Sequence, residues 1–196
     1  MSASQLNPGA CTAFLLAAFT LAGLCQTAWL ASPASQQFFV PLDGGRTFRG
    51  RRLFGANKTV RGFLMIVPAA GASFALLAAF FASSPAGLAG LWPLSLRDYA
   101  LLGLWAGAGF MVGELPNSFI KRQLDIAPGA AAHGRSLRIL FSVVDRIDWI
   151  AGMLLALCLI VPVPGRVWMY VAVIGPVVHW CFSVALFQLG VKGRAA

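Results

Sequence analysis

The sequence predicts an all-α integral membrane protein with about five transmembrane helices. Hydrophobic residues make up 59% of the chain and charged residues only 11%, whereas a soluble domain carries roughly 25% charged residues. The apolar residues also gather into five stretches of about 20 residues, the length that crosses a bilayer. Because five such spans use roughly half of the chain, we expect residues 1–196 to form a single membrane-embedded domain.

Three of the predicted spans are apolar on all sides. They are residues 11–31, 62–82 and 167–189, the first, second and fifth spans in chain order. The first span has no charged side chain, and its polar residues are Gln26 and a few hydroxyl groups. Its length and the absence of a positively charged segment before it argue against a cleaved signal peptide.

The third span, residues 99–119, and the fourth span, residues 143–163, contain acidic side chains. A carboxylate in a membrane span is costly unless it is paired or bound to a metal, so these acids require partners. The third span also carries two pairs of glycines at four-residue spacing, which predicts close packing against neighbouring helices. These pairs are Gly103 with Gly107 and Gly109 with Gly113.

The net charge of +9 is spread unevenly over the predicted connections. Of 15 basic residues, 13 lie in the loop of residues 32–61, in or beside the loop of residues 120–142, or in the C-terminal tail with Lys192 and Arg194. The positive-inside rule therefore predicts an outside N-terminus, a cytoplasmic C-terminus and two long basic loops on the cytoplasmic face of the inner membrane. Nucleic acid is not expected as a partner, because the cations are confined between apolar segments.

The loop of residues 32–61 alternates glycines with cations and hydroxyl donors. It contains D-G-G-R starting at Asp43, R-R-L-F-G ending at Gly55, and N-K-T-V-R-G ending at Gly62. Glycine lets the backbone approach an anion, while Lys and Arg supply charge and Thr a hydrogen bond. The loop is therefore predicted to bind phosphate, although it does not contain the P-loop motif. The alternative is that its cations only orient the protein and contact anionic lipid.

The third span ends with G-E-L-P-N-S-F-I-K-R. On a helix, Glu114, Ser118 and either Lys121 or Arg122 share one face, and Pro116 is expected to kink the helix. Two explanations of the carboxylate stay open at this point. Glu114 forms an ion pair with Lys121 or Arg122, or it contributes to a metal site.

The fourth span begins with V-V-D-R-I-D-W, so Asp145 and Asp148 share a helix face. Two like charges at this spacing repel each other, which is explained if a cation lies between them. With Glu114 they would supply three oxygen ligands, and Mg²⁺ commonly uses carboxylates together with substrate phosphates and water. The alternative is an ion pair of either aspartate with Arg146 or Arg138.

Other chemistries find less support. The four cysteines show no C-x-x-C spacing, so we interpret them as buried thiols and expect neither zinc nor a disulfide framework. They are Cys11, Cys25, Cys158 and Cys181. His179 is interpreted as a packed residue of the fifth span. A Ser-His-Asp arrangement around His133 stays open, but the G-x-S-x-G motif is absent.

Taken in order, the motifs resemble the CDP-archaeol synthase family, small five-span cytidylyltransferases related to the CDP-diacylglycerol synthases. They are D-G-G-x-T-F-x-G-x-R-L-F-G-x-x-K-T-x-R-G, then G-E-L-x-N-S-F-x-K-R, then D-R-x-D, running from Asp43 to Asp148. The resemblance implies transfer of CMP from CTP to a membrane lipid phosphate, with release of pyrophosphate. The product would be a CDP-lipid of the archaeol or diacylglycerol type, made for phospholipid biosynthesis at the cytoplasmic face.

The resemblance also implies residue roles. Lys58, Lys121 and Arg122 match positions that handle nucleotide and phosphate charge in catalysis, and Asp145 and Asp148 match the acidic pair associated with a divalent metal. The substrate-binding residues implied in this way are Asp43, Gly44, Arg52, Gly55, Lys58, Thr59, Arg61, Gly62, Asn117, Ser118, Lys121, Arg122 and Arg146.

This chain departs from the family pattern at two places. Glu114, the third candidate metal ligand, stands where the wider family generally has Asp. Arg135 and Arg138 add basic residues before the fourth span, so an ether or an ester lipid remains open as the acceptor. The expected cofactor is Mg²⁺, a second, monovalent cation being a further option. The oligomeric state is open, a homodimer included.

Two other functional classes account for fewer of these features. A small transporter or channel would use the acidic residues along a polar path, but transporter sites lie near the bilayer midplane, whereas these carboxylates cluster at one face. A non-catalytic scaffold for anionic lipid explains the charge of +9, but it does not explain Asp145 and Asp148.

Overall fold

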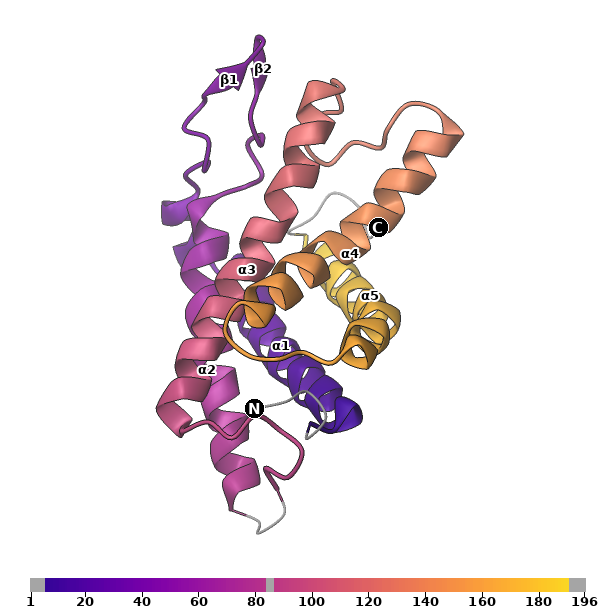
Figure 1. The fold of residues 1–196 in the computed structure, drawn as a ribbon. Coiled ribbons are helices and arrows are strands. Elements are labelled where there is room, and N and C mark those ends of the chain that lie inside the picture. The colour runs from indigo at the N-terminus through magenta and orange to yellow at the C-terminus, as the bar shows by residue number, and fades with distance from the viewer. Residues whose placement is uncertain (1–5, 84–86, 191–196) are drawn as a thin grey trace.

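A computed structural model describes residues 6–83 and 87–190, which are mainly helical (Figure 1). The elements are α1 (Pro8–Ala31), the 3₁₀ helix η2 (Pro33–Phe38), β1 (Thr47–Phe48), β2 (Arg51–Arg52), α2 (Val60–Ala82), α3 (Leu96–Gln123), α4 (Arg135–Cys158) and α5 (Gly165–Gln188). The five long helices follow the order of the five predicted spans, so the all-α class is confirmed, with one two-stranded hairpin added.

Three of the described helices, α1, α2 and α5, are long and apolar enough to cross a membrane. Helices α3 and α4 have 28 and 24 residues but carry charged side chains. Figure 1 shows the β1–β2 hairpin and the α3–α4 connection at the same end of the molecule. Lys192 and Arg194, whose charges support the predicted membrane topology, lie outside the described residues.

The glycine pairs of α3 pack as predicted. A Cβ added to Gly103 would lie 2.6 Å from the carbonyl oxygen of Ala70 on α2. A Cβ added to Gly113 would lie 2.7 Å from the Cα of Gly152 on α4. The absence of side chains at these positions lets α3 approach a helix on each side, so α3 holds its neighbours at backbone distance.

The predicted boundaries are wrong at the ends of α3 and α4. Helix α3 continues through Pro116 to Gln123, and α4 begins at Arg135, eight residues before the predicted start of the span at 143. The apolar run defines only the part of α4 that resembles a span, whereas the helix itself extends into a cationic segment. At the other end, α4 stops at Cys158 instead of reaching 163, ahead of Pro162 and Pro164.

Aromatic side chains form the core at the end of the molecule away from the basic loops. The ring of Phe14 lies edge-on to Phe74, with centroids 5.2 Å apart. The hydroxyl of Tyr99 donates to the carbonyl of Trp92 at 2.6 Å. The four cysteines are free thiols, but only Cys11 is buried, so the prediction of buried thiols is wrong for the other three, whose side chains are exposed on the outer faces of the helices.

The loop between α1 and α2 has more structure than the sequence indicated. Its tip is the antiparallel hairpin, in which Thr47 pairs with Arg52 and the turn is made by Arg49 and Gly50 at positive φ. Arg51 forms an ion pair with Asp125 and so ties the hairpin to the segment after α3. The α1–α2 loop and the α3–α4 connection are therefore in direct contact with each other.

Candidate active site

A cavity of about 1160 Å³ opens between the five long helices and is lined by both basic connections. It gathers most of the residues that the sequence marked for substrate and metal. These are Lys58, Thr59, Arg61, Gly62, Glu114, Asn117, Ser118, Lys121, Arg122, Asp145, Arg146 and Asp148. Four predicted substrate-binding residues are not part of its lining: Asp43, Gly44, Arg52 and Gly55.

Lys58 lies one residue before Thr59, the N-cap of α2, and lines the cavity. The backbone there is held by a bridge between Pro41 and Thr59 and by the Leu42 N–H, which donates to the Lys58 carbonyl at 2.8 Å. The Lys58 ammonium forms an ion pair with Glu114 of α3, and each side chain is 19% exposed. Glu114 therefore contacts a lysine far away in sequence, and the expected local pair with Lys121 or Arg122 is not the one formed.

Desolvation alone would lower the pKa of Lys58, but the negative charge of Glu114, with Asp148 and Asp145 beyond it, outweighs burial. The pKa of Lys58 is consequently raised above its ordinary value. Its side chain is a permanent cation at neutral pH, positioned among three carboxylates. Such a group can pair with phosphate as well as with carboxylate.

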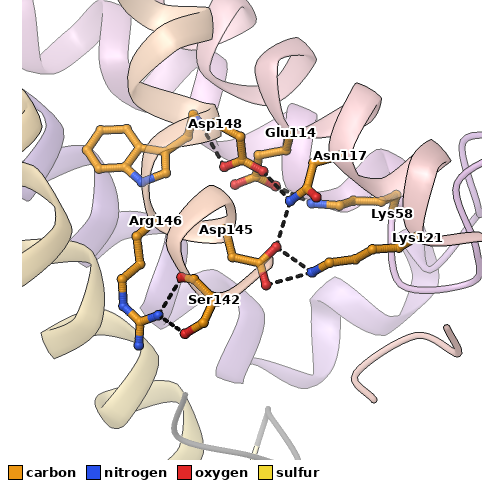
Figure 2. Close-up of polar contacts among 9 residues, drawn as sticks. Lys58, Glu114, Asn117, Lys121, Ser142, Asp145, Arg146 and Asp148 are labelled. Carbon is orange, nitrogen blue, oxygen red and sulfur yellow. Dashed lines mark hydrogen bonds and ion pairs between the residues drawn. The ribbon is translucent and has the colours of Figure 1, made fainter. Parts of the chain in front are cut away.

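Asp145 and Asp148 of α4 face α3, where Asn117 lies between them (Figure 2). The Asn117 amide nitrogen donates to Asp145 Oδ1 at 2.6 Å and to Asp148 Oδ2 at 2.8 Å. Lys121 pairs with the outer side of Asp145, its Nζ lying 2.6 Å from Oδ2. The partner of Asp145 is thus Lys121, and not Arg146 or Arg138.

Arg146 points away from these carboxylates (Figure 2). Its guanidinium donates to the carbonyl and hydroxyl oxygens of Ser142, one turn earlier on α4. Since Arg146 also lines the cavity, it contributes positive charge near the site without neutralising an acid among the described residues.

Arg122 is the most deeply buried cation in the lining, 8% exposed, and its Nε and Nη1 have no hydrogen-bond partner among the described residues. Burial lowers the pKa of its guanidinium, which nevertheless stays charged at neutral pH. A Cβ at position 55 would lie 3.1 Å from Arg122 Nη1, and φ there is +91°. Gly55 therefore serves the site indirectly, because it makes room for Arg122.

Asp43 organises the loop between α1 and α2 and does not line the cavity. Its carboxylate pairs with Arg52 and accepts the backbone N–H groups of Gly45 at 3.0 Å, Phe54 at 3.1 Å and Gly55 at 3.0 Å. Burial favours a higher pKa, but these donors outweigh it, so the pKa of Asp43 lies well below its ordinary range. Asp43 and Arg52 are therefore structural residues of the loop.

The carboxylates fit a divalent cation in part. Asp145 and Asp148 present oxygens around one point at Asn117, and oxygen is the donor type that Mg²⁺ prefers. Over the described ranges, no three His, Cys, Asp or Glu side chains form a group that could hold a metal. A metal here would need the aspartate pair together with amide, water or phosphate oxygens.

Sequence reasoning missed the wall of the cavity formed by α1 and α5. Helix α1 contributes Leu15, Phe19 and Gln26, and α5 contributes His179 and Phe182. Among these, Gln26 and His179 carried a signal, each as a polar side chain within an apolar span; His179 was interpreted only as a packed residue. The cavity therefore changes from cationic and acidic at one end to apolar between α1 and α5.

Comparison with known proteins identifies a single family. A family model described as "CarS-like: CDP-archaeol synthase" matches residues 36–195. A CDP-archaeol synthase of Halobacterium salinarum is 35% identical over 78% of this chain and 81% of its own length. One of Pyrococcus furiosus is 31% identical over 76% of this chain and 79% of its own. A solved intramembrane enzyme for archaeal membrane-lipid biosynthesis aligns with a TM-score of 0.54 and 25% identity, covering 85% of this chain and 90% of that one.

Proposed function

This chain belongs to the CDP-archaeol synthase family, and on that premise we propose that it transfers CMP from CTP to an archaeol-type lipid phosphate, forming CDP-archaeol. It is an integral membrane protein and a CTP-dependent cytidylyltransferase. The observation that carries the proposal is the single cavity, which joins a polar end containing Lys58, Arg122 and Asp145 to an apolar wall of α1 and α5. Family membership favours an enzyme over a transporter or a lipid-binding scaffold.

The two ends of the cavity suit the two substrates. The cationic end, with unpartnered donors on Arg122, favours the triphosphate of CTP. The apolar wall lets the hydrocarbon chains of the acceptor remain in the bilayer while its phosphate reaches the polar end. Both reactants then meet inside one protein cavity, which supplies the orientation that a reaction between two anions requires.

The chemistry needs little acid–base help from the protein. A phosphomonoester has a second pKa near 6, so the lipid phosphate is already an anionic nucleophile. Its oxygen attacks the α-phosphorus of CTP, the bond between the α-phosphorus and its bridging oxygen to the β-phosphate breaks, and pyrophosphate leaves. Lys58, Lys121 and Arg122 neutralise the negative charge of the two substrates and of the leaving group.

Magnesium is the proposed cofactor, held by Asp145 and Asp148, whose oxygens face one point. When bound, it would offset the charge of the triphosphate and favour departure of pyrophosphate. Glu114 is assigned to Lys58 in this proposal, because their ion pair sets the position of that ammonium.

We propose that α3 and α4 cross the membrane together with α1, α2 and α5, with the N-terminus outside and the active site at the cytoplasmic face of the inner membrane. The positive-inside rule supports this orientation. The basic connections lie at one end of the molecule (Figure 1), whereas Arg97 and Arg166 are at the other ends of α3 and α5.

Radiolabelled CTP tests the function directly. Detergent-purified protein with Mg²⁺ should convert α-labelled CTP and an archaeol-type ether-lipid phosphate into a labelled CDP-lipid, with one pyrophosphate released per product. Lys58→Ala should abolish this turnover, whereas Arg166→Ala, an exposed cation outside the cavity, should not. Phosphatidic acid in a parallel reaction separates an ether from an ester preference. Absence of CDP-lipid with every acceptor would refute the proposal.

A further inference from the structure

Asn117 occupies an unusual position, between two carboxylates of the same charge. Its amide nitrogen is within hydrogen-bond distance of both Asp145 and Asp148, at 2.6 and 2.8 Å (Figure 2). The side chain comes from α3 and the two acids come from α4, so the amide connects the helices at the polar end of the cavity. The amide nitrogen thus lies at the point where the two carboxylates converge.

The other half of the amide is unsatisfied. Asn117 is 6% exposed, and its Oδ1 is buried without a hydrogen-bond partner among the described residues. A buried acceptor without a partner costs about 1–3 kcal/mol, so such atoms in a folded protein require an explanation. A half-turn about the Cβ–Cγ bond exchanges Oδ1 with Nδ2 and brings the oxygen to the two carboxylates.

That second orientation is favourable only with a cation. Three oxygens directed at one point repel each other, but together they form a ligand set that suits Mg²⁺ or Mn²⁺. Other nearby acceptors are less suited, because Glu114 is paired with Lys58. Asn117 is therefore the described residue best placed to complete the aspartate pair.

We propose that Asn117 is a metal ligand of this site: its amide nitrogen holds Asp145 and Asp148 together in the arrangement seen here, and its Oδ1 turns to bind the divalent cation. The inference rests on the metal site of the proposed function and adds a third protein ligand to it. It gives the amide oxygen, which has no hydrogen-bond partner among the described residues, a role at the point where the two carboxylates converge.

A competing explanation predicts the opposite change in metal affinity when the Asn117 side chain is removed. If Asn117 is only a hydrogen-bond donor, its NH₂ group competes with the cation for the carboxylates. Removing the side chain would then strengthen metal binding. If Oδ1 is a ligand, removing the side chain weakens metal binding. Direct measurement of metal affinity, without nucleotide or turnover, separates the two.

The experiment is a titration of purified protein with Mn²⁺, in which free Mn²⁺ is followed by electron paramagnetic resonance. Asn117→Ala and the similarly sized Asn117→Leu should each raise the Kd for Mn²⁺ about tenfold or more. Asn117→Asp should lower it, because a carboxylate oxygen replaces the amide oxygen. Ser73→Ala, which removes a buried hydroxyl from α2 outside the cavity, is the control and should leave the Kd unchanged.

Thermal unfolding adds a second readout. In the presence of a chelator Asn117→Asp should melt at a lower temperature than the wild type, because three carboxylates converge, and Mn²⁺ should restore its melting temperature. Asn117→Leu keeps the packed volume, so the Kd can be measured on it if the alanine variant does not fold. The inference is overturned if the folded Ala or Leu variant binds Mn²⁺ as tightly as the wild type or more tightly, if Asn117→Asp does not bind more tightly, or if the wild type binds none.

Failure of the proposed function would look different. A wild-type protein that binds Mn²⁺ through Asn117 but makes no CDP-lipid would refute the function and leave the ligand assignment intact. A protein that makes CDP-lipid, with Mn²⁺ affinity unaffected by Asn117→Leu, would refute only the assignment.

Discussion

Lys58 and Glu114 are separated by 56 positions in the sequence, yet their side chains form an ion pair that joins the loop before α2 to helix α3. The pair fixes a cation beside the two aspartates of α4, because Asp148 and Asp145 also act on the Lys58 charge. Three segments of the chain therefore meet at this lysine.

Breaking the pair should impair both stability and turnover. Glu114→Gln leaves a largely buried ammonium without its charged partner, so we expect a loss of about 2–3 kcal/mol in the free energy of unfolding and a lower kcat/KM. Glu114→Asp keeps the charge and should be milder in both respects. Melting curves in detergent and steady-state kinetics check this; a glutamine variant as stable as the wild type would contradict the importance of the pair.

The aspartate pair should be essential to turnover but not to folding. Asp145→Asn and Asp148→Asn each remove a charge proposed to hold Mg²⁺, and turnover should fall at least about 100-fold. Asp125→Asn is the matched control, since Asp125 is an exposed acid paired with Arg51 outside the cavity. Comparable CDP-lipid synthesis by all three variants would remove the aspartates from the mechanism.

Asp43 should stabilise the protein in a pH-dependent way. Its pKa is lowered in the folded state, so its stabilisation is complete above the ordinary carboxyl pKa of about 4 and is lost as the pH falls toward the folded-state pKa. Asp43→Asn should cost about 1–3 kcal/mol near pH 7, and this difference should shrink below pH 4. Melting temperatures of both proteins across pH 3–8 measure it, and a difference that grows in acid would reverse the expected sign.

The contact between α3 and α4 should tolerate no added methyl group at Gly113. A Cβ there would lie 2.6 Å from the carbonyl oxygen of Asp148, so Gly113→Ala should push the aspartate away from Asn117. We expect a loss of about 1–3 kcal/mol in stability and reduced turnover. Gly165→Ala, where no atom lies within 4 Å of the added Cβ, is the control. Equal behaviour of the two variants would indicate that α4 can shift without consequence.

Much of the fold follows from local patterns. The apolar runs locate α1, α2 and α5, and the four-residue glycine spacing predicts that α3 packs closely, because both features depend on neighbouring residues along one helix. The start of α4 could not be found in this way. Residues 135–142 are helical but cationic, so they lack the hydrophobic signal that marks a span.

The site was predictable in its members but not in its pairings. Spacing alone suggested Lys121 or Arg122 as the partner of Glu114, since both are about two turns away on α3. The observed partner, Lys58, depends on how α2 and α3 pack, which spacing within one helix does not contain. For the same reason, the motif that contains Asn117 indicated only a substrate-binding role for it. Its position between two aspartates of another helix is seen only in the folded structure.

Under the proposed function, Asp43 would also affect the free-energy cost of binding the nucleotide. Its carboxylate holds the N–H groups of Gly45, Phe54 and Gly55, so the backbone of the loop is fixed before a ligand arrives. Ordering a flexible segment on binding consumes about 1–2 kcal/mol of conformational entropy for each residue whose backbone is fixed. A loop ordered during folding does not incur that cost again, so a larger share of the attraction between its cations and the triphosphate proposed to bind there would be retained as affinity.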